Sequence, residues 1–139
     1  CRILVVGHPY NIYDPYVGGP VLDCLRSLNT VPIIADIVDR REALERSTNI
    51  TATLPWAFNR QLVGAIDIYR RYVDGIVLMS TFPCGPDSLV NEIVIRRVRD
   101  LPVLNLLIDG QEGTAGLETR LESFVDIIHF KREEDITLA

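Results

Sequence analysis

The sequence contains at its centre the run Gly75-Ile76-Val77-Leu78-Met79-Ser80, which is short, continuous and rich in apolar and β-branched residues. Runs of this kind are typical of strands that are buried on both faces of a parallel sheet. Three further runs, residues 2–7, 32–36 and 103–109, have the same character. Pro32 and Pro102 stand where two of these runs begin, a position at which a strand tolerates a missing N–H group. We therefore predict four strands.

Between these runs the apolar residues recur at the spacing of an amphipathic helix, which predicts four helices. Proline at positions 20, 55 and 86 is expected to stand at the first helical position, where its missing N–H group costs nothing. A short additional helix is predicted over Arg40–Arg46, followed by a loop over residues 47–53. The four apolar stripes are Val21, Leu25 and Leu28; Phe58, Leu62, Ile66, Tyr69 and Val73; Val90, Ile93, Val94 and Val98; and Leu117, Leu121, Phe124, Val125 and Ile128.

Strands that alternate with helices predict an α/β fold in which helices cover both faces of a parallel sheet. Because crossover connections are right-handed, the expected architecture is a three-layer, Rossmann-like domain over residues 1–139 with the flavodoxin-like strand order 2-1-3-4. Ligands of such sheets bind beyond the carboxyl ends of the strands, where the chain reverses direction. The loops at residues 8–19 and 81–85 are expected to meet at that point.

Composition limits the classes of function. The chain has 139 residues, of which 47% are apolar and 24% are charged, and its net charge is −5. An acidic chain without a basic stripe argues against nucleic acid as a partner. No apolar run reaches the roughly 20 residues of a membrane helix, and no signal peptide is visible. We therefore expect a cytoplasmic protein and, because the chain enters a strand at once without an initiating Met, one domain of a longer multidomain protein.

Cys84 is the main candidate for chemistry. Cys1, Cys24 and Cys84 make an odd number of cysteines, which excludes a complete disulfide framework and favours reduced thiols. Cys84 follows a predicted strand and precedes a predicted helix start, where the helix dipole stabilises a thiolate, the form needed by a nucleophile or a metal ligand. The alternative is a small buried thiol beneath a loop. Cys24 is expected in the core.

The loop after the first strand offers further candidates. His8 can assist a metal site or bond to a backbone carbonyl. Tyr10, Tyr13 and Tyr16 can stack on a planar ligand or pack the loop itself. The glycines of this loop lack the spacing of a dinucleotide-binding site, and no Walker loop is present. The interpretations of this loop are therefore a binding site for a small ligand or for a partner.

Three other features have both a structural and a functional interpretation. Asp14 and Asp87 can pair with cations or, more commonly, cap backbone N–H groups. Trp56 and Phe58 can belong to the core or present an aromatic edge to a partner domain. The glycine-rich turn at residues 110–116 can bind an anion through its N–H groups, although Glu112 opposes this.

Three runs span most of the chain in a recognisable order: Gly7-His8-Pro9-Tyr10-Asn11-Ile12-Tyr13-Asp14-Pro15, Phe82-Pro83-Cys84-Gly85-Pro86-Asp87-Ser88-Leu89-Val90, and Ile108-Asp109 with residues 115–126. These runs resemble, in the same order, the domain attached to acyl-CoA dehydratase activases, which is related to the subunits of 2-hydroxyacyl-CoA dehydratase and benzoyl-CoA reductase. After Asp109 an acidic residue and a histidine usually follow in that family, whereas Gly110 and Gln111 stand here.

The resemblance implies a role in low-potential electron transfer driven by an ATP-hydrolysing activator. Cys84 would be one thiolate ligand of a four-iron four-sulfur cluster, with His8, Tyr10 and Asn11 beside the cofactor. One thiolate is too few for a cluster, so the other ligands would come from other domains of the parent chain, and the domain alone is expected to be inactive and without the cluster. A CoA thioester and an ATPase activator domain are the expected partners in this anaerobic chemistry.

Two alternatives stay open beside this interpretation. One is a non-catalytic module that binds a partner or a small ligand in the same crevice. The other is a thiol enzyme that uses Cys84 as nucleophile, for which His8 is the available base.

Overall fold

A four-stranded parallel sheet forms the centre of the computed structural model, which describes residues 1–36, 38–81, 85–109 and 114–138. The strands are β1 (Arg2–Val6), β2 (Val31–Ile34), β3 (Gly75–Thr81) and β4 (Val103–Ile108). They lie in the order β2-β1-β3-β4, with every pair parallel. The predicted α/β fold and strand order are confirmed, and the architecture is consistent with a Rossmann-like, flavodoxin-like fold.

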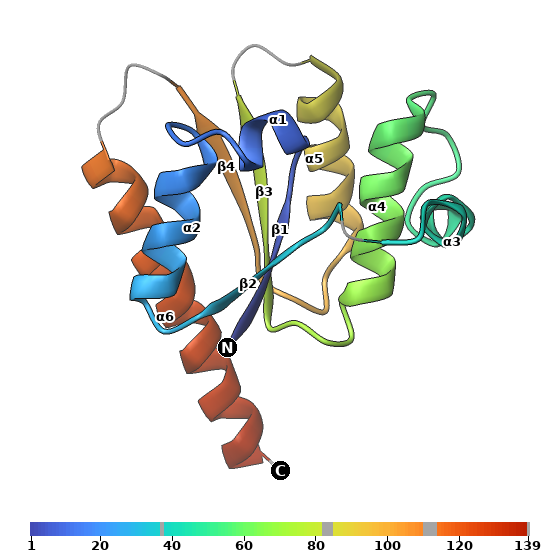
Figure 1. Cartoon of the computed structure of the whole chain (residues 1–139). Coiled ribbons are helices and arrows are strands. Elements are labelled where there is room, and N and C mark those ends of the chain that lie inside the picture. The colour runs from blue at the N-terminus through green and yellow to red at the C-terminus, as the bar shows by residue number, and fades with distance from the viewer. Residues whose placement is uncertain (37, 82–84, 110–113, 139) are drawn as a thin grey trace.

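Helices cover both faces of this sheet (Figure 1). The helices α2 and α6 lie on one side and α3, α4 and α5 on the other, while α1 lies over the ends of β1 and β3. No helix in the described part of the chain is long and apolar enough to cross a membrane. The helical elements are α1 (Pro9–Ile12), α2 (Gly18–Ser27), α3 (Arg40–Arg46), η1 (Ser47–Asn49), α4 (Ala57–Tyr69), α5 (Gly85–Arg97) and α6 (Thr114–Leu138).

Alternate residues of the central strands supply two separate cores. Leu4 and Ile76 point to the face covered by α4 and α5, whereas Ile3 and Val77 point to the face covered by α2 and α6. All four side chains are buried. This two-sided burial explains why the strands read as continuous apolar runs rather than as alternating ones.

Several predicted details differ from the structure. The loop after β1 contains the short helix α1, with Pro9 rather than Pro20 at a helix start, and α2 already begins at Gly18. Pro55 lies two residues before α4, which ends at Tyr69, so that the buried Val73 follows the helix instead of belonging to it. Proline fits the first turn of a helix but does not fix its first residue. The prediction of α3 over Arg40–Arg46 is confirmed.

A polar cluster fixes the corner between α3 and α4. Asp67, near the end of α4, accepts hydrogen bonds from Arg46 Nε and Asn49 Nδ2, each at 2.8 Å, and lies 3.3 Å from Arg70 Nη2. The two helices approach closely, because a Cβ atom at Gly64 would overlap the backbone carbonyl of Ala43. Glycine at position 64 is therefore a packing requirement.

Candidate functional site

The carboxyl ends of β1 and β3 lie side by side, because Val6 pairs with Leu78 in the parallel register. Gly7 follows β1 at this point, and a Cβ atom there would come within 2.7 Å of the Met79 carbonyl oxygen, so the two chains meet without room for a side chain. The loop after β1 and the start of α5 both lie at this edge of the sheet (Figure 1). The two segments therefore meet where the strand order reverses, which is the place where ligands of such sheets bind.

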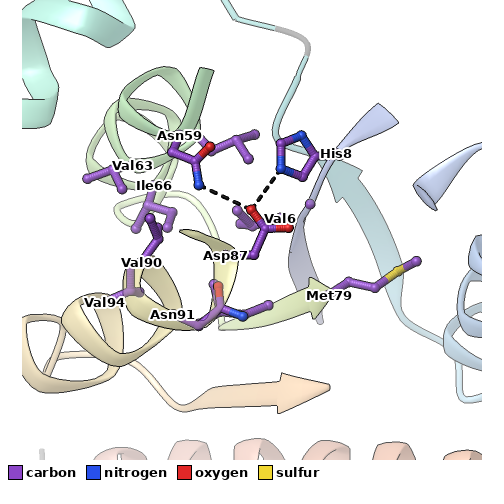
Figure 2. Close-up of a pocket in the computed structure, with 13 residues that line it drawn as sticks. Val6, His8, Asn59, Val63, Ile66, Met79, Asp87, Val90, Asn91 and Val94 are labelled. Carbon is purple, nitrogen blue, oxygen red and sulfur yellow. Dashed lines mark hydrogen bonds and ion pairs between the residues drawn. The ribbon is translucent and has the colours of Figure 1, made fainter. Parts of the chain in front are cut away.

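A buried carboxylate joins three elements at this edge. Asp87, in the first turn of α5, has its Oδ1 atom 2.7 Å from His8 Nε2 and 3.1 Å from Asn59 Nδ2 of α4. Figure 2 shows both side chains pointing at the Asp87 carboxylate. An ionised carboxylate only accepts hydrogen bonds, so with Asp87 ionised the proton of a neutral His8 ring is on Nε2. Asp87 thus fixes the orientation and the tautomer of His8.

The His8 ring is also held between two aromatic rings. Its centroid lies 5.0 Å from that of Tyr10 and 4.8 Å from that of Phe58, with interplanar angles of 16° and 21°. Tyr10 belongs to α1 and Phe58 to α4, so the stack connects the loop after β1 with the first turn of α4. This stack, together with Asp87, leaves the imidazole little freedom to rotate.

His8 also lines a small cavity whose wall is mostly apolar with a few polar side chains. Its volume is about 10 Å³, which is the space of about one water molecule and too small for an organic ligand. An organic ligand of this edge therefore does not bind within the cavity. The polar lining is His8, Asn59, Asp87 and Asn91, and the apolar lining is Val6, Leu62, Val63, Ile66, Leu78, Met79, Val90 and Val94 (Figure 2).

More buried polar side chains surround the end of β3. Asn91 Nδ2 donates to Asn105 Oδ1 at 3.1 Å and, more weakly, to Ser80 Oγ at 3.4 Å. Asn11 is buried in α1, and Thr81 Oγ1 lies 3.5 Å from its Oδ1 atom. Asn11 Nδ2 has no hydrogen-bond partner within the described residues. Buried amides are normally paired, so their concentration at one edge marks it as different from the rest of the core.

A second contact joins the loop after β1 to the end of β2. The Tyr13 hydroxyl donates to the Asp36 carboxylate, with oxygen distances of 3.2 and 3.3 Å. Burial and the nearby Asp36 charge raise the pKa of Tyr13. Asp14 caps the turn before α2, because its Oδ1 atom accepts from the backbone N–H groups of Tyr16 and Val17. Its carbonyl also accepts from Gly18 and Gly19, so these α2 N–H groups are already used, in line with the missing dinucleotide motif.

The structure brings three of the four predicted site residues to one edge of the sheet. His8, Tyr10 and Asn11 lie there, whereas Cys84 falls in residues 82–84, which link β3 to α5 and lie outside the described residues. The predicted anion-binding turn lies mostly outside them as well. His8 bonds to the Asp87 carboxylate instead of to a backbone carbonyl, and within the described residues the Asp87 carboxylate pairs with side chains and not with a helix cap.

The other cysteines lie elsewhere. Cys1 precedes β1, at the opposite end of that strand from His8, and Cys24 lies on α2. Cys24 is half-buried and packs against the core between α2 and α6, so the prediction of a core residue is confirmed only in part. Burial and the nearby charges of Glu118 and Glu122 raise the pKa of the Cys24 thiol, which disfavours a thiolate there.

Sequence reasoning missed Asn59 and Asp36. Asn59 could have been recognised from the sequence, because it shares a helical face with Val63 and Ile66. A polar residue on such an apolar face requires a buried partner. Asp36 had no such signal, since its contact with Tyr13 depends on how the loop after β1 folds back over β2.

Within the described residues, no three His, Cys, Asp or Glu side chains are close enough together to hold a metal ion. Comparison of the sequence with protein-family models and with curated proteins found no match. The groups that this edge offers for chemistry are an oriented imidazole, a buried carboxylate and an exposed aromatic ring stacked on the imidazole.

Proposed function

We propose that this chain is the cluster-binding domain of an acyl-CoA dehydratase activase-related protein, in which Cys84 supplies one thiolate to a four-iron four-sulfur cluster shared with another part of the protein. The cluster would pass low-potential electrons in a system driven by ATP hydrolysis. In this proposal His8, Tyr10 and Asn11 line the cluster side of the crevice.

The observation that carries the proposal is the contact between His8 and Asp87. His8 belongs to the Gly-His-Pro-Tyr-Asn run and Asp87 to the Cys-Gly-Pro-Asp run, the two runs on which the resemblance depends most. These residues are separated by 79 positions, yet their side chains lie 2.7 Å apart at the edge where ligands of such sheets bind. The pairing supports the idea that both runs serve one site.

The cysteines of this chain could supply part of the ligands of a four-iron four-sulfur cluster, but not all of them. A four-iron cluster is held by about four thiolates. Cys1 and Cys24 lie away from the crevice, which leaves Cys84 as the thiol that the chain order brings to the start of α5. The His8 ring is already bonded through Nε2 to Asp87. The remaining ligands are therefore assigned to other domains.

The test is anaerobic reconstitution of the parent protein with iron and sulfide, in parallel with Cys84→Ser and Cys24→Ser variants. Cys84→Ser should change the visible absorption and the paramagnetic signal of the reduced cluster, whereas Cys24→Ser should leave both unchanged. If the Cys84→Ser protein keeps the spectra of the unsubstituted protein, Cys84 is not a ligand and the proposal is wrong.

The oriented imidazole gives some support to a second candidate, a thiol enzyme with Cys84 as nucleophile. His8 has the orienting carboxylate that a catalytic base commonly has. For this candidate, the rate of Cys84 alkylation should depend on pH, and this dependence should be lost in a His8→Gln variant. A rate whose pH dependence is the same in both proteins removes this candidate.

A further inference from the structure

The small cavity beside His8 lies where α4 and α5 meet the ends of β1 and β3. Three polar side chains of its wall are almost fully buried, with exposed fractions of 4% for Asn59, 6% for Asp87 and 7% for Asn91. Asn59 bonds to Asp87, and Asn91 follows Asp87 by one helical turn on α5 (Figure 2). The three side chains therefore form one polar group in the wall of the cavity.

This polar group contains more acceptor atoms than the donors around it serve. Asp87 Oδ1 accepts from His8 Nε2 and Asn59 Nδ2, whereas no donor among the described residues reaches Asp87 Oδ2. In the same part of the chain, Asn59 and Asn91 donate through their Nδ2 atoms, and no hydrogen bond reaches their side-chain oxygens. Buried polar groups are normally paired, and ordered water supplies the partner where the protein offers none.

The size and the wall of the cavity decide which molecule can serve these oxygens. The volume of about 10 Å³ admits about one water molecule and nothing larger. A water molecule can donate to two of the three oxygens and accept from the second N–H of Asn59 Nδ2, which gives the three hydrogen bonds that are usual for a buried water. A sodium or ammonium ion is disfavoured, because most of the wall is apolar and burying a charge there is costly.

We propose that this cavity is a binding site for a single internal water molecule, held by Asp87, Asn59 and Asn91. The water donates to the Asp87 oxygen that the described residues leave open, while the other oxygen holds His8. A donor at each oxygen stabilises the ionised carboxylate, which is the form that fixes the His8 tautomer. The site consists of described residues and depends neither on Cys84 nor on a cluster.

Two measurements on the chain test the site. A high-resolution crystal structure should show one water within hydrogen-bond distance of Asp87. Nuclear Overhauser spectra of the isotope-labelled chain should show cross-peaks between water and the side-chain amide protons of Asn59, with the sign of a long-lived internal water. Ser80→Ala is the control for exchange through a hydroxyl group, since Ser80 Oγ lies 3.4 Å from Asn91 Nδ2. The Asn59 cross-peaks should persist in this variant.

Substitutions that fill the cavity separate an internal water from water at the surface. Val90→Ile and Val63→Ile each add one methyl group to the wall, from α5 and from α4, and each should remove the water and the Asn59 cross-peaks. Val21→Ile is the matched control, because it adds the same group to the core on the other face of the sheet. It should leave both signals unchanged.

Three results would overturn the proposal. The first is an unsubstituted chain that shows neither the water nor the cross-peaks, and the second is persistence of the cross-peaks in both filling variants. The third is a signal that differs between sodium, potassium and tetramethylammonium buffers, which would assign the cavity to a monovalent cation. Because every variant retains Cys84 and His8, a negative result here leaves the cluster proposal intact, and loss of the cluster proposal leaves this one intact.

Discussion

Asp67 and Asp87 are both buried on the same face of the sheet, with 2% and 6% of their surfaces exposed, but their partners differ. Asp67 has two arginines and an asparagine around it, near the C-terminal end of α4. Asp87 has a histidine and an asparagine, at the edge where β1 and β3 end. The charge of the first carboxylate is balanced by two guanidinium groups, whereas the second bonds to an imidazole and an amide.

This difference in partners distinguishes a carboxylate that holds the fold together from one that belongs to the candidate functional site. Burial by itself would raise the pKa of Asp67, but the hydrogen bonds from Asn49 and Arg46 and the charges of Arg46 and Arg70 outweigh it and lower the pKa. Such a group holds two helices together and is not available for proton transfer. Asp87 orients an imidazole at the edge where β1 and β3 end, which is an arrangement suited to binding or chemistry.

The largest expected effect is that of Asp67→Ala. Removing the carboxylate leaves Arg46 and Arg70 without their buried partner, so the free energy of unfolding should fall by about 3 kcal/mol. Urea denaturation measures this change. The control is Asp23→Ala, which removes an exposed pair with Arg26 and should cost less than about 0.5 kcal/mol. Equal costs for the two variants would show that the α3–α4 corner does not depend on Asp67.

Substitution of Asp87 should have the next largest effect. Asp87→Ala removes two buried hydrogen bonds, one of them to histidine, and should lower the free energy of unfolding by about 2 kcal/mol. Asp87→Asn keeps an acceptor oxygen and should cost less. The nitrogen shifts of the His8 ring should change in both variants. If these shifts stay at the wild-type values, Asp87 does not orient His8 in solution.

The contribution of Asp67 to stability should depend on pH. Because the pKa of Asp67 is lower in the folded state than in the unfolded state, the unfolded chain binds the proton more readily. The stabilisation from Asp67 is therefore complete above the unfolded pKa of about 4 and is lost as the pH falls through the folded pKa. Urea midpoints of wild type and Asp67→Asn should converge as the pH falls below the unfolded pKa of about 4 and through the lower pKa of the folded state. Parallel curves would contradict this.

The smallest effect concerns Tyr13. Burial, followed by the charge and the hydrogen bond of Asp36, raises the pKa of its phenol. Asp36→Asn should move this pKa part of the way back, since burial remains. Tyrosine ring shifts recorded up to about pH 12 measure it, and Asp39→Asn should leave the titration unchanged. An unchanged titration in Asp36→Asn would show that the contact with Asp36 does not persist in solution.

Much of the fold could be predicted because the signals are local. Continuous apolar runs such as Gly75–Thr81 require burial on both faces, which a parallel sheet between two helical layers provides. Right-handed crossovers then leave few strand orders. The short helix α1 was missed because four residues carry too little periodicity, although Pro9 is at its first position.

The sequence by itself determined the strands, the layers and the edge at which His8, Tyr10 and Asn11 lie. It did not determine that His8 bonds to Asp87, that Asn59 completes the group, or that Tyr13 reaches Asp36. Those pairs are separated by 79, 28 and 23 positions, and each contact depends on helix packing and loop path. Local periodicity specifies which face of an element is buried, but only the packed tertiary structure decides which buried polar groups meet.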